Sequence, residues 1–408
     1  MTEHTPFSWL PDGNLCSPKG FKAGATYAGI KTYGEEPRRD LGLLVADRDC
    51  SVGGIFTQNA LMGAPVLLSR EVTRAGRSRG IVVNSGCSNV AMGEQGLLAA
   101  RRMQELAAAH AGVPGELLCV GSTGVIGRPI PLKKVETGLK EVSLSKDGGD
   151  DFARSMMTTD TVSKSRAVTF QYKGQAYVVA GSAKGSGMAH PNMATVFCFL
   201  TTDARAPSTW MQKMVKSVGD RTINMVDVDM DTSTSDMMLA FASGAAEGPD
   251  LSQDPEGSLL LERAFFQVAE ALAKDLARDG EGARTLIEVR VKGAASVQEA
   301  RIAARTVVSS PLVKTMVTGK DPNLGRVLMA LGRSGASLEL SRLSVWLEGQ
   351  LAFDCGQPTD LDLERISAAM DAKTVVFEAN LGVGEGAATA WGCDLTEDYI
   401  RINADYTT

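Results

Sequence analysis

Short apolar runs alternate along this chain with glycine-rich stretches. Three of these runs, residues 81–83, 118–120 and 177–179, stand directly before the sequences Asn-Ser-Gly, Gly-Ser-Thr-Gly and Ala-Gly, and a fourth covers residues 196–200. Buried strands typically appear as short apolar runs bounded by turn residues. The pattern therefore predicts buried strands, the first three of which end in glycine turns.

Other segments have the pattern of helices that pack on a sheet. Residues 96–111 are rich in alanine and contain few helix breakers. A single apolar stripe with helical spacing is formed by Leu261, Phe265, Val268, Leu272 and Leu276. A second cycle of strands is expected at residues 286–291 and 300–308, with helices near residues 326–331 and 361–370. Together these elements predict a mixed α/β fold in which helices cover layered sheets.

Chain length and charge limit the domain organisation and the class of partner. A chain of 408 residues exceeds the usual size of one hydrophobic core, so two closely packed domains are expected. The best loop signal, Asp147-Gly-Gly-Asp, is too short to separate them. A net charge of −6 without a Lys/Arg block argues against nucleic acid. No apolar run or leader suggests a membrane or export, so a cytoplasmic enzyme is expected.

Cysteine and histidine are distributed in a way that disfavours metal chemistry. The seven cysteines are scattered, so reduced thiols are expected. The histidines are only His4, His110 and His190, too few to suggest a metal site or a histidine-based triad. We therefore expect no metal and no resident cofactor.

The segment Lys184-Gly-Ser-Gly-Met-Ala-His-Pro-Asn-Met-Ala-Thr195 has the residue types needed for backbone self-cleavage. A hydroxyl can add to the preceding carbonyl when the peptide is strained and donors stabilise the oxyanion. Cleavage would leave the α-amine of Thr195, with an ordinary pKa of about 8, beside its own hydroxyl as a base. The alternative is a glycine-rich loop before a buried strand.

This segment resembles the self-cleavage site of the ornithine acetyltransferase family, the glutamate N-acetyltransferases of arginine biosynthesis. Further matching stretches lie throughout the chain, at residues 18–21, 83–86, 93–96, 122–129, 158–161, 231–234, 279–283, 321–326, 390–394 and 402–405. The resemblance implies cleavage between Ala194 and Thr195 into an α chain (1–194) and a β chain (195–408), with a second α/β domain from about residue 283. It also implies an α2β2 assembly of the processed chains.

The resemblance also assigns roles to individual residues. Thr195 would be the nucleophile, and Thr123 and Gly124 would form the oxyanion hole. The substrate-binding positions would be Thr158, Lys184, Thr195, Glu281, Asn403 and Thr408. Opposite charges on Lys184 and Glu281 suit the carboxylate and ammonium of an amino acid. The residues alone leave simpler explanations open: Thr123 as a helix N-cap, and both charged groups as solvated surface residues.

The implied reaction is a ping-pong transfer of acetyl from N-acetyl-ornithine to glutamate, with acetyl-CoA possible as a second donor. The alternatives are a self-processed threonine amidohydrolase or aminopeptidase, a paralogous acyltransferase with another amino-acid substrate, and a non-catalytic binding protein. The chain departs from common family residues within residues 84–90, where the thiol of Cys87 replaces an amide, and at Met230, Ser235 and Leu324. None of them is an expected catalytic position, but they leave substrate specificity open.

Overall fold

A nine-stranded sheet forms the larger part of the protein in a computed structural model, which describes residues 6–31, 37–190 and 196–405. Its strands are β1 (Phe7–Trp9), β2 (Phe21–Thr26), β3 (Leu41–Phe56), β4 (Arg77–Cys87), β5 (Leu118–Val125), β6 (Lys164–Tyr172), β7 (Gln175–Lys184), β8 (Phe197–Thr202) and β10 (Met237–Ala242). They are ordered β1-β6-β7-β8-β10-β3-β4-β5, with β2 paired to β3. Strand β8 thus lies between β7 and β10.

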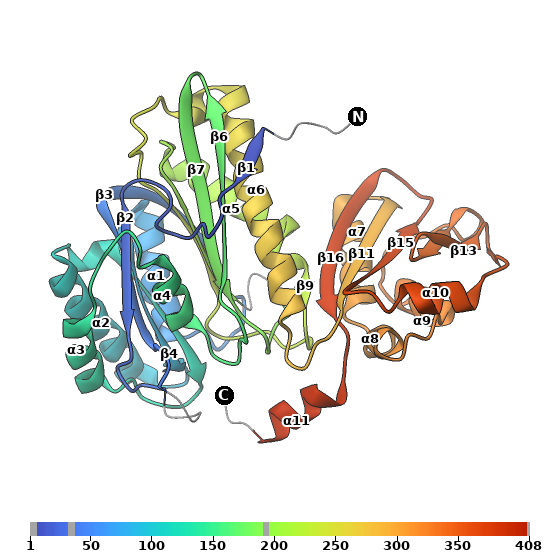
Figure 1. The fold of residues 1–408 in the computed structure, drawn as a ribbon, viewed down its shortest axis with the longest axis horizontal. Coiled ribbons are helices and arrows are strands. Elements are labelled where there is room, and N and C mark those ends of the chain that lie inside the picture. The colour runs from blue at the N-terminus through green and yellow to red at the C-terminus, as the bar shows by residue number, and fades with distance from the viewer. Residues whose placement is uncertain (1–5, 32–36, 191–195, 406–408) are drawn as a thin grey trace.

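Helices cover this sheet and complete what we call the N-terminal lobe (Figure 1). They are α1 (Ala64–Ala75), α2 (Gly93–Ala111), α3 (Leu132–Glu141), α4 (Gly149–Met156), α5 (Ser208–Arg221) and α6 (Pro255–Arg278). Helix α6 packs on β6 and β7, α5 on β3, and α1 on β5. All five residues of the apolar stripe on α6 are buried, as its spacing predicts.

A seven-stranded sheet forms the C-terminal lobe. Its strands are β9 (Val226–Asp227), β11 (Leu286–Ala294), β12 (Ser344–Leu347), β13 (Gln350–Asp354), β14 (Gln357–Pro358), β15 (Thr374–Asn380) and β16 (Gly386–Cys393), in the order β14-β13-β12-β15-β11-β16-β9. The helices of this part of the chain are α7 (Val297–Val308), α8 (Pro311–Thr318), α9 (Leu324–Gly332), α10 (Leu363–Ala369) and α11 (Glu397–Asp405). Short 3₁₀ turns lie at Gly115–Leu117, Ile223–Met225, Leu251–Gln253 and Leu340–Arg342. These layers confirm the predicted mixed α/β fold.

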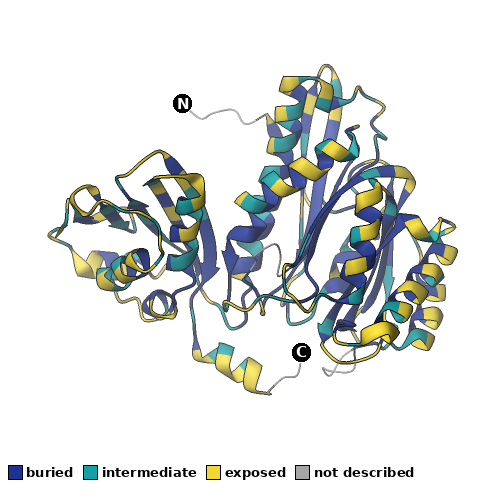
Figure 2. Ribbon diagram, turned by 180° about the vertical axis from the view of Figure 1, so that it is seen from behind, coloured by how far each residue is buried: buried dark blue, intermediate teal, exposed yellow. Residues whose placement is uncertain are grey.

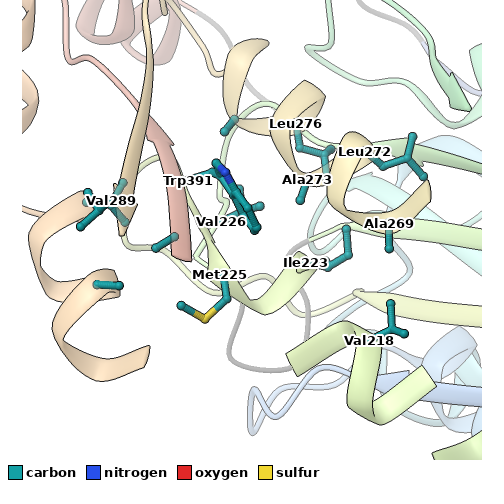
Figure 3. Packing of buried hydrophobic residues seen from close by; sticks show 14 of the residues in the cluster. Val218, Ile223, Met225, Val226, Ala269, Leu272, Ala273, Leu276, Val289 and Trp391 are labelled. Atoms are coloured by element: carbon teal, nitrogen blue, oxygen red, sulfur yellow. The ribbon is translucent and has the colours of Figure 1, made fainter. Parts of the chain in front are cut away.

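One continuous hydrophobic cluster joins the two lobes. Trp391 on β16 is fully buried against Val226 of β9 and faces α6, where Leu272 and Leu276 lie (Figure 3). The indole nitrogen donates to Glu288 Oε2 at 2.9 Å, so its polar atom is satisfied. Because apolar burial drives association, this cluster stabilises the packing of the two lobes against each other.

Two expectations about local structure were wrong. Residues 300–308 form helix α7 and not a strand. The glycines after the first three apolar runs do not make turns either, since β4, β5 and β7 continue through them. In β5 and β4, Gly124 and Gly86 are paired, and a Cβ on Gly124 would lie 2.7 Å from the carbonyl carbon of Gly86. These two glycines therefore allow close backbone approach within a sheet.

Candidate active site

A cavity of about 140 Å³ collects six of the expected site residues. They are Thr123, Gly124, Thr158, Lys184, Glu281 and Asn403. Thr123 and Asn403 are 280 positions apart in the sequence, so the fold, and not local sequence, brings these residues together. The expected residues Ala194, Thr195 and Thr408 lie outside the described residues.

The oxyanion-hole candidates are held in the sheet. Thr123 lies within β5 and is paired with Ser85 of β4, and its side chain is largely buried. This position inside a strand excludes the helix N-cap interpretation. Within the described ranges, the Thr123 hydroxyl makes no hydrogen bond to another residue. Gly124 follows with φ of 113°, a backbone conformation that glycine adopts readily.

Lys184 presents a positive charge to this cavity. It is the last residue of β7 and pairs with Phe197, whose ring centre lies 5.4 Å from the ammonium nitrogen. The residue is only 8% exposed, which overturns the solvated-surface interpretation. Its ammonium group has no hydrogen bond or ion pair with any residue in the described part of the chain. Burial lowers the pKa of Lys184, although Asp160 and Asp236 oppose that shift.

Glu281 supplies the negative charge of the site and is also 8% exposed. Its Oε2 accepts a hydrogen bond from Asn403 Nδ2 at 2.7 Å, and its backbone N–H donates to the Ser186 carbonyl at 2.8 Å. A Cβ on Gly187 would lie 2.4 Å from the Glu281 carboxyl carbon. Glycine at position 187 therefore provides the space that this carboxylate occupies.

One buried carboxylate fixes two further parts of the cavity wall. Asp160 accepts from the Thr158 backbone N–H at 3.1 Å and from the Gly185 backbone N–H at 2.7 Å. Lys164 forms an ion pair with Asp160 at 2.7 Å and with Asp279 at 2.5 Å. Burial opposes ionisation of Asp160, but the Lys164 and Lys184 ammonium groups lower its pKa overall. The network thus positions Thr158 and the residue after Lys184.

Thr195 itself is not described, but its chain neighbour is. Val196 is 1% exposed, and its carbonyl accepts from the Met237 backbone N–H at 3.2 Å. The next residue, Phe197, begins β8 beside Lys184. The buried strand predicted at residues 196–200 is therefore present, and it starts next to the cavity.

Several cavity residues were not expected from the sequence. They are Ser88, Ile126, Thr159, Gly187, Met188, Asp229, Asp231, Ser233, Thr234, Ser235 and Tyr399. Tyr399 lies four residues before Asn403 on α11, so helical spacing could have identified it. Its hydroxyl donates to Asp229 Oδ2 at 3.4 Å, and burial raises the pKa of that aspartate.

Two classes of feature are not found in the described parts of the chain. No three His, Cys, Asp or Glu side chains of those residues are grouped so that they could hold a metal ion. No helix of those residues combines the length and hydrophobicity that crossing a bilayer requires. All seven cysteines are free.

Comparison with known proteins extends over nearly the whole chain. The model of the ArgJ family matches residues 22–408. The arginine biosynthesis bifunctional protein ArgJ of Dehalococcoides mccartyi is 44% identical over 399 residues, which cover 98% of each chain. The protein of the same description from Symbiobacterium thermophilum is 44% identical over 402 residues, covering 98% of this chain and 100% of that protein. The ornithine acetyltransferase of Mycobacterium tuberculosis, solved with ornithine, is 32% identical; the match covers 46% of this chain and 100% of that chain with a TM-score of 0.42.

The cavity and the extent of these matches define an enzyme of the acyltransferase type. An oxyanion-hole candidate and buried groups of both charges suit acyl transfer between amino acids. The chain belongs to the ArgJ family.

Proposed function

We propose that this chain transfers an acetyl group from N-acetyl-ornithine to glutamate through an ester on Thr195. The observation that carries this proposal is the convergence of Thr123, Gly124, Lys184 and Glu281 on one cavity, next to the strand that follows Thr195. Relatives that share 44% of their residues with this chain are named for arginine biosynthesis. This supports an amino-acid substrate of that pathway.

Self-cleavage would come first. The Thr195 hydroxyl adds to the Ala194 carbonyl, the C–N bond breaks, and the resulting ester is hydrolysed by water. The products are a new carboxylate on Ala194 and a free α-amine on Thr195. Donors at Thr123 and Gly124 would stabilise the negative oxygen of each tetrahedral intermediate.

Acetyl transfer would then repeat the same attack on a substrate. The Thr195 hydroxyl adds to the acetyl carbonyl of N-acetyl-ornithine while its own α-amine takes the hydroxyl proton and delivers it to the departing ornithine amine. The amine of glutamate next attacks the acetyl ester and releases Thr195. Lys184 would bind a substrate carboxylate because its buried ammonium lacks any anionic partner at hydrogen-bonding distance among the described residues. Glu281 would bind a substrate ammonium.

The two fragments would remain associated after cleavage. Strand pairing joins the two fragments at two places in the nine-stranded sheet. Strand β7 of the first fragment pairs with β8 of the second, and β3 of the first pairs with β10 of the second. Helix α6 of the second fragment also packs on β6 and β7 of the first. Separation would expose these buried strand edges and apolar faces to water. The resemblance implies that two such pairs assemble as α2β2, which light scattering would test.

Denaturing gels, N-terminal sequencing and a transfer assay test the proposal. The purified protein should give fragments 1–194 and 195–408, the second with threonine at its N-terminus. Thr195→Ala should give one intact chain and no acetyl transfer, because no hydroxyl remains to attack either carbonyl. Cleavage in that variant would show that Thr195 is not the nucleophile. Acetate release that does not depend on glutamate would instead favour the hydrolase alternative.

A further inference from the structure

The segment that leads into the proposed cleavage site is bound to residues 228–232, the loop that follows β9. Backbone N–H groups of Met188 and Ala189 donate to the two carboxylate oxygens of Asp229 at 2.6 and 2.8 Å. The Ala189 carbonyl accepts from Val228 N at 2.6 Å, and His190 N donates to the Asp231 carbonyl at 3.1 Å. Residues 188–190 are therefore fixed at several backbone positions.

His190 adds a side-chain link to the C-terminal lobe. Its Nδ1 lies 2.7 Å from Asp227 Oδ1, and its Nε2 lies 2.7 Å from the Arg305 guanidinium on α7. A guanidinium group can only donate hydrogen bonds, so Nε2 must accept. The ring proton is then on Nδ1, where it is donated to Asp227. The two contacts together define one tautomer and one ring orientation.

Asp227, the carboxylate partner of His190, is itself firmly held. Asp227 is fully buried in β9, and Lys314 on α8 places its ammonium 3.0 Å from Asp227 Oδ2. Burial opposes ionisation of Asp227, but the positive charge of Lys314 and the hydrogen bond from His190 lower its pKa overall. Lys314 also donates to the Cys393 carbonyl at the end of β16 at 3.0 Å. Helices α7 and α8 and strand β16 thus support a single imidazole.

We propose that His190 is a positioning residue for self-cleavage, which holds the chain upstream of the Ala194–Thr195 bond against the C-terminal lobe. The imidazole sits five residues before Thr195. A nucleophile attacks its neighbouring carbonyl only from a narrow range of geometries, and small displacements reduce the rate steeply. The inference rests on the proposed self-cleavage. It assigns the C-terminal lobe a role in maturation that the acetyl-transfer step does not require.

A pulse-chase experiment on the full-length chain tests this role. Newly synthesised protein is followed by denaturing gel and intact mass, and the rate of conversion into two fragments is measured. His190→Ala and Arg305→Met should each convert at least about tenfold more slowly than the wild type. His190→Asn should be slowed less, because its amide can still donate from near the Nδ1 position to Asp227.

Two controls separate positioning from general damage. Arg301→Met removes the same charge one turn earlier on α7, where the nearest acid, Asp220, is 3.9 Å away, and it should convert at the wild-type rate. The mature fraction of each His190 variant should keep wild-type kcat and KM. Wild-type conversion rates in His190→Ala and Arg305→Met would overturn the inference, as would a fall in kcat that matches the fall in cleavage rate. A wild-type chain that stays intact would overturn the proposed function itself, and this inference with it.

Discussion

Two walls of the cavity are built from different kinds of structure. Thr123 and Gly124 lie inside β5, which is paired along its length with β4. Glu281 follows α6 in a loop, and Asn403 lies on α11, a helix with no buried residue that turns back from the C-terminal lobe (Figures 1 and 2). The first wall is part of a buried sheet, whereas the second combines a loop with an exposed helix.

This difference matches what each wall is proposed to do. Oxyanion donors must be in place before negative charge develops, so they gain most from a rigid support. Groups that bind the charged ends of a substrate are in contact with it before the reaction begins. They therefore stabilise the ground state and the transition state by similar amounts. Changes at Thr123 and Gly124 should therefore alter kcat, and changes in the loop and helix wall should mainly alter KM.

The largest effect is expected from Thr123→Ala. Loss of one oxyanion donor should lower kcat for acetyl transfer by about 10²-fold, with little change in KM. Steady-state kinetics on the mature protein would measure both. Ser122→Ala is the matched control, because Ser122 is the neighbouring buried residue of β5 but does not line the cavity, so loss of its hydroxyl should leave kcat close to wild type. Equal effects in the two variants would contradict the assignment of Thr123.

Glu281→Gln should instead act on binding. A hydrogen bond to a charged group contributes about 1.5–3 kcal/mol, which corresponds to about a 10- to 150-fold rise in KM for the amino-acid substrates. Because Gln is close to Glu in shape, kcat should change little. Glu397→Gln removes the same charge from the exposed start of α11 and should leave KM unchanged. A fall in kcat without a rise in KM would place Glu281 in the chemical step.

Sequence patterns predicted the elements whose signals are local and periodic. The buried stripe of α6 is an example, because apolar residues recur at helical spacing from Leu261 to Leu276. For helix α7 the local pattern favours the wrong element, because Thr306, Val307 and Val308 have strand propensity. The signal for a helix is instead its N-cap: Ser296 stands three residues before Glu299, and its hydroxyl accepts from the Glu299 backbone N–H at 3.1 Å.

The site was predictable only in part, for a physical reason. Motif matches supplied the residues Thr123, Lys184, Glu281 and Asn403 but gave no indication of their mutual distances. Their convergence depends on non-local strand pairing and on the return of α11, which no spacing in the sequence encodes. His190 shows the same limit. Its partners Asp227 and Arg305 are 37 and 115 positions away in the chain, so a lone histidine gave no signal of its role.

The binding role of Lys184 can be tested through the pH dependence of KM for glutamate. Its ammonium form is the one that binds a carboxylate, and burial lowers its pKa below the ordinary lysine value of about 10.4. As pH rises through that lowered pKa, the positive charge is lost and KM for glutamate should increase. Lys184→Gln should start from a higher KM and lack this additional alkaline increase. Parallel KM profiles in the two proteins would contradict the role of Lys184.

The smallest effect is expected from Asn403→Ala. This change removes a hydrogen bond to Glu281 in the loop and helix wall without removing a charge. Asn403 Nδ2 donates to Glu281 Oε2 at 2.7 Å and to the Tyr399 carbonyl of its own helix at 3.0 Å. Because Asn403 is exposed and its loss leaves the Glu281 charge in place, we expect only the effect of an ordinary hydrogen bond, about 0.5–1.5 kcal/mol, or about a 2- to 10-fold rise in KM.

Asn403→Asp makes the test more stringent, because it places a second carboxylate beside Glu281 and should raise KM further. Kinetics of both variants, with fragment formation followed on the same samples, would separate binding from maturation. Self-cleavage should proceed normally in both, since the proposed junction and oxyanion hole do not include α11. If either variant cleaved slowly, α11 would have to support the sheet wall as well, and the two walls could not be treated as independent.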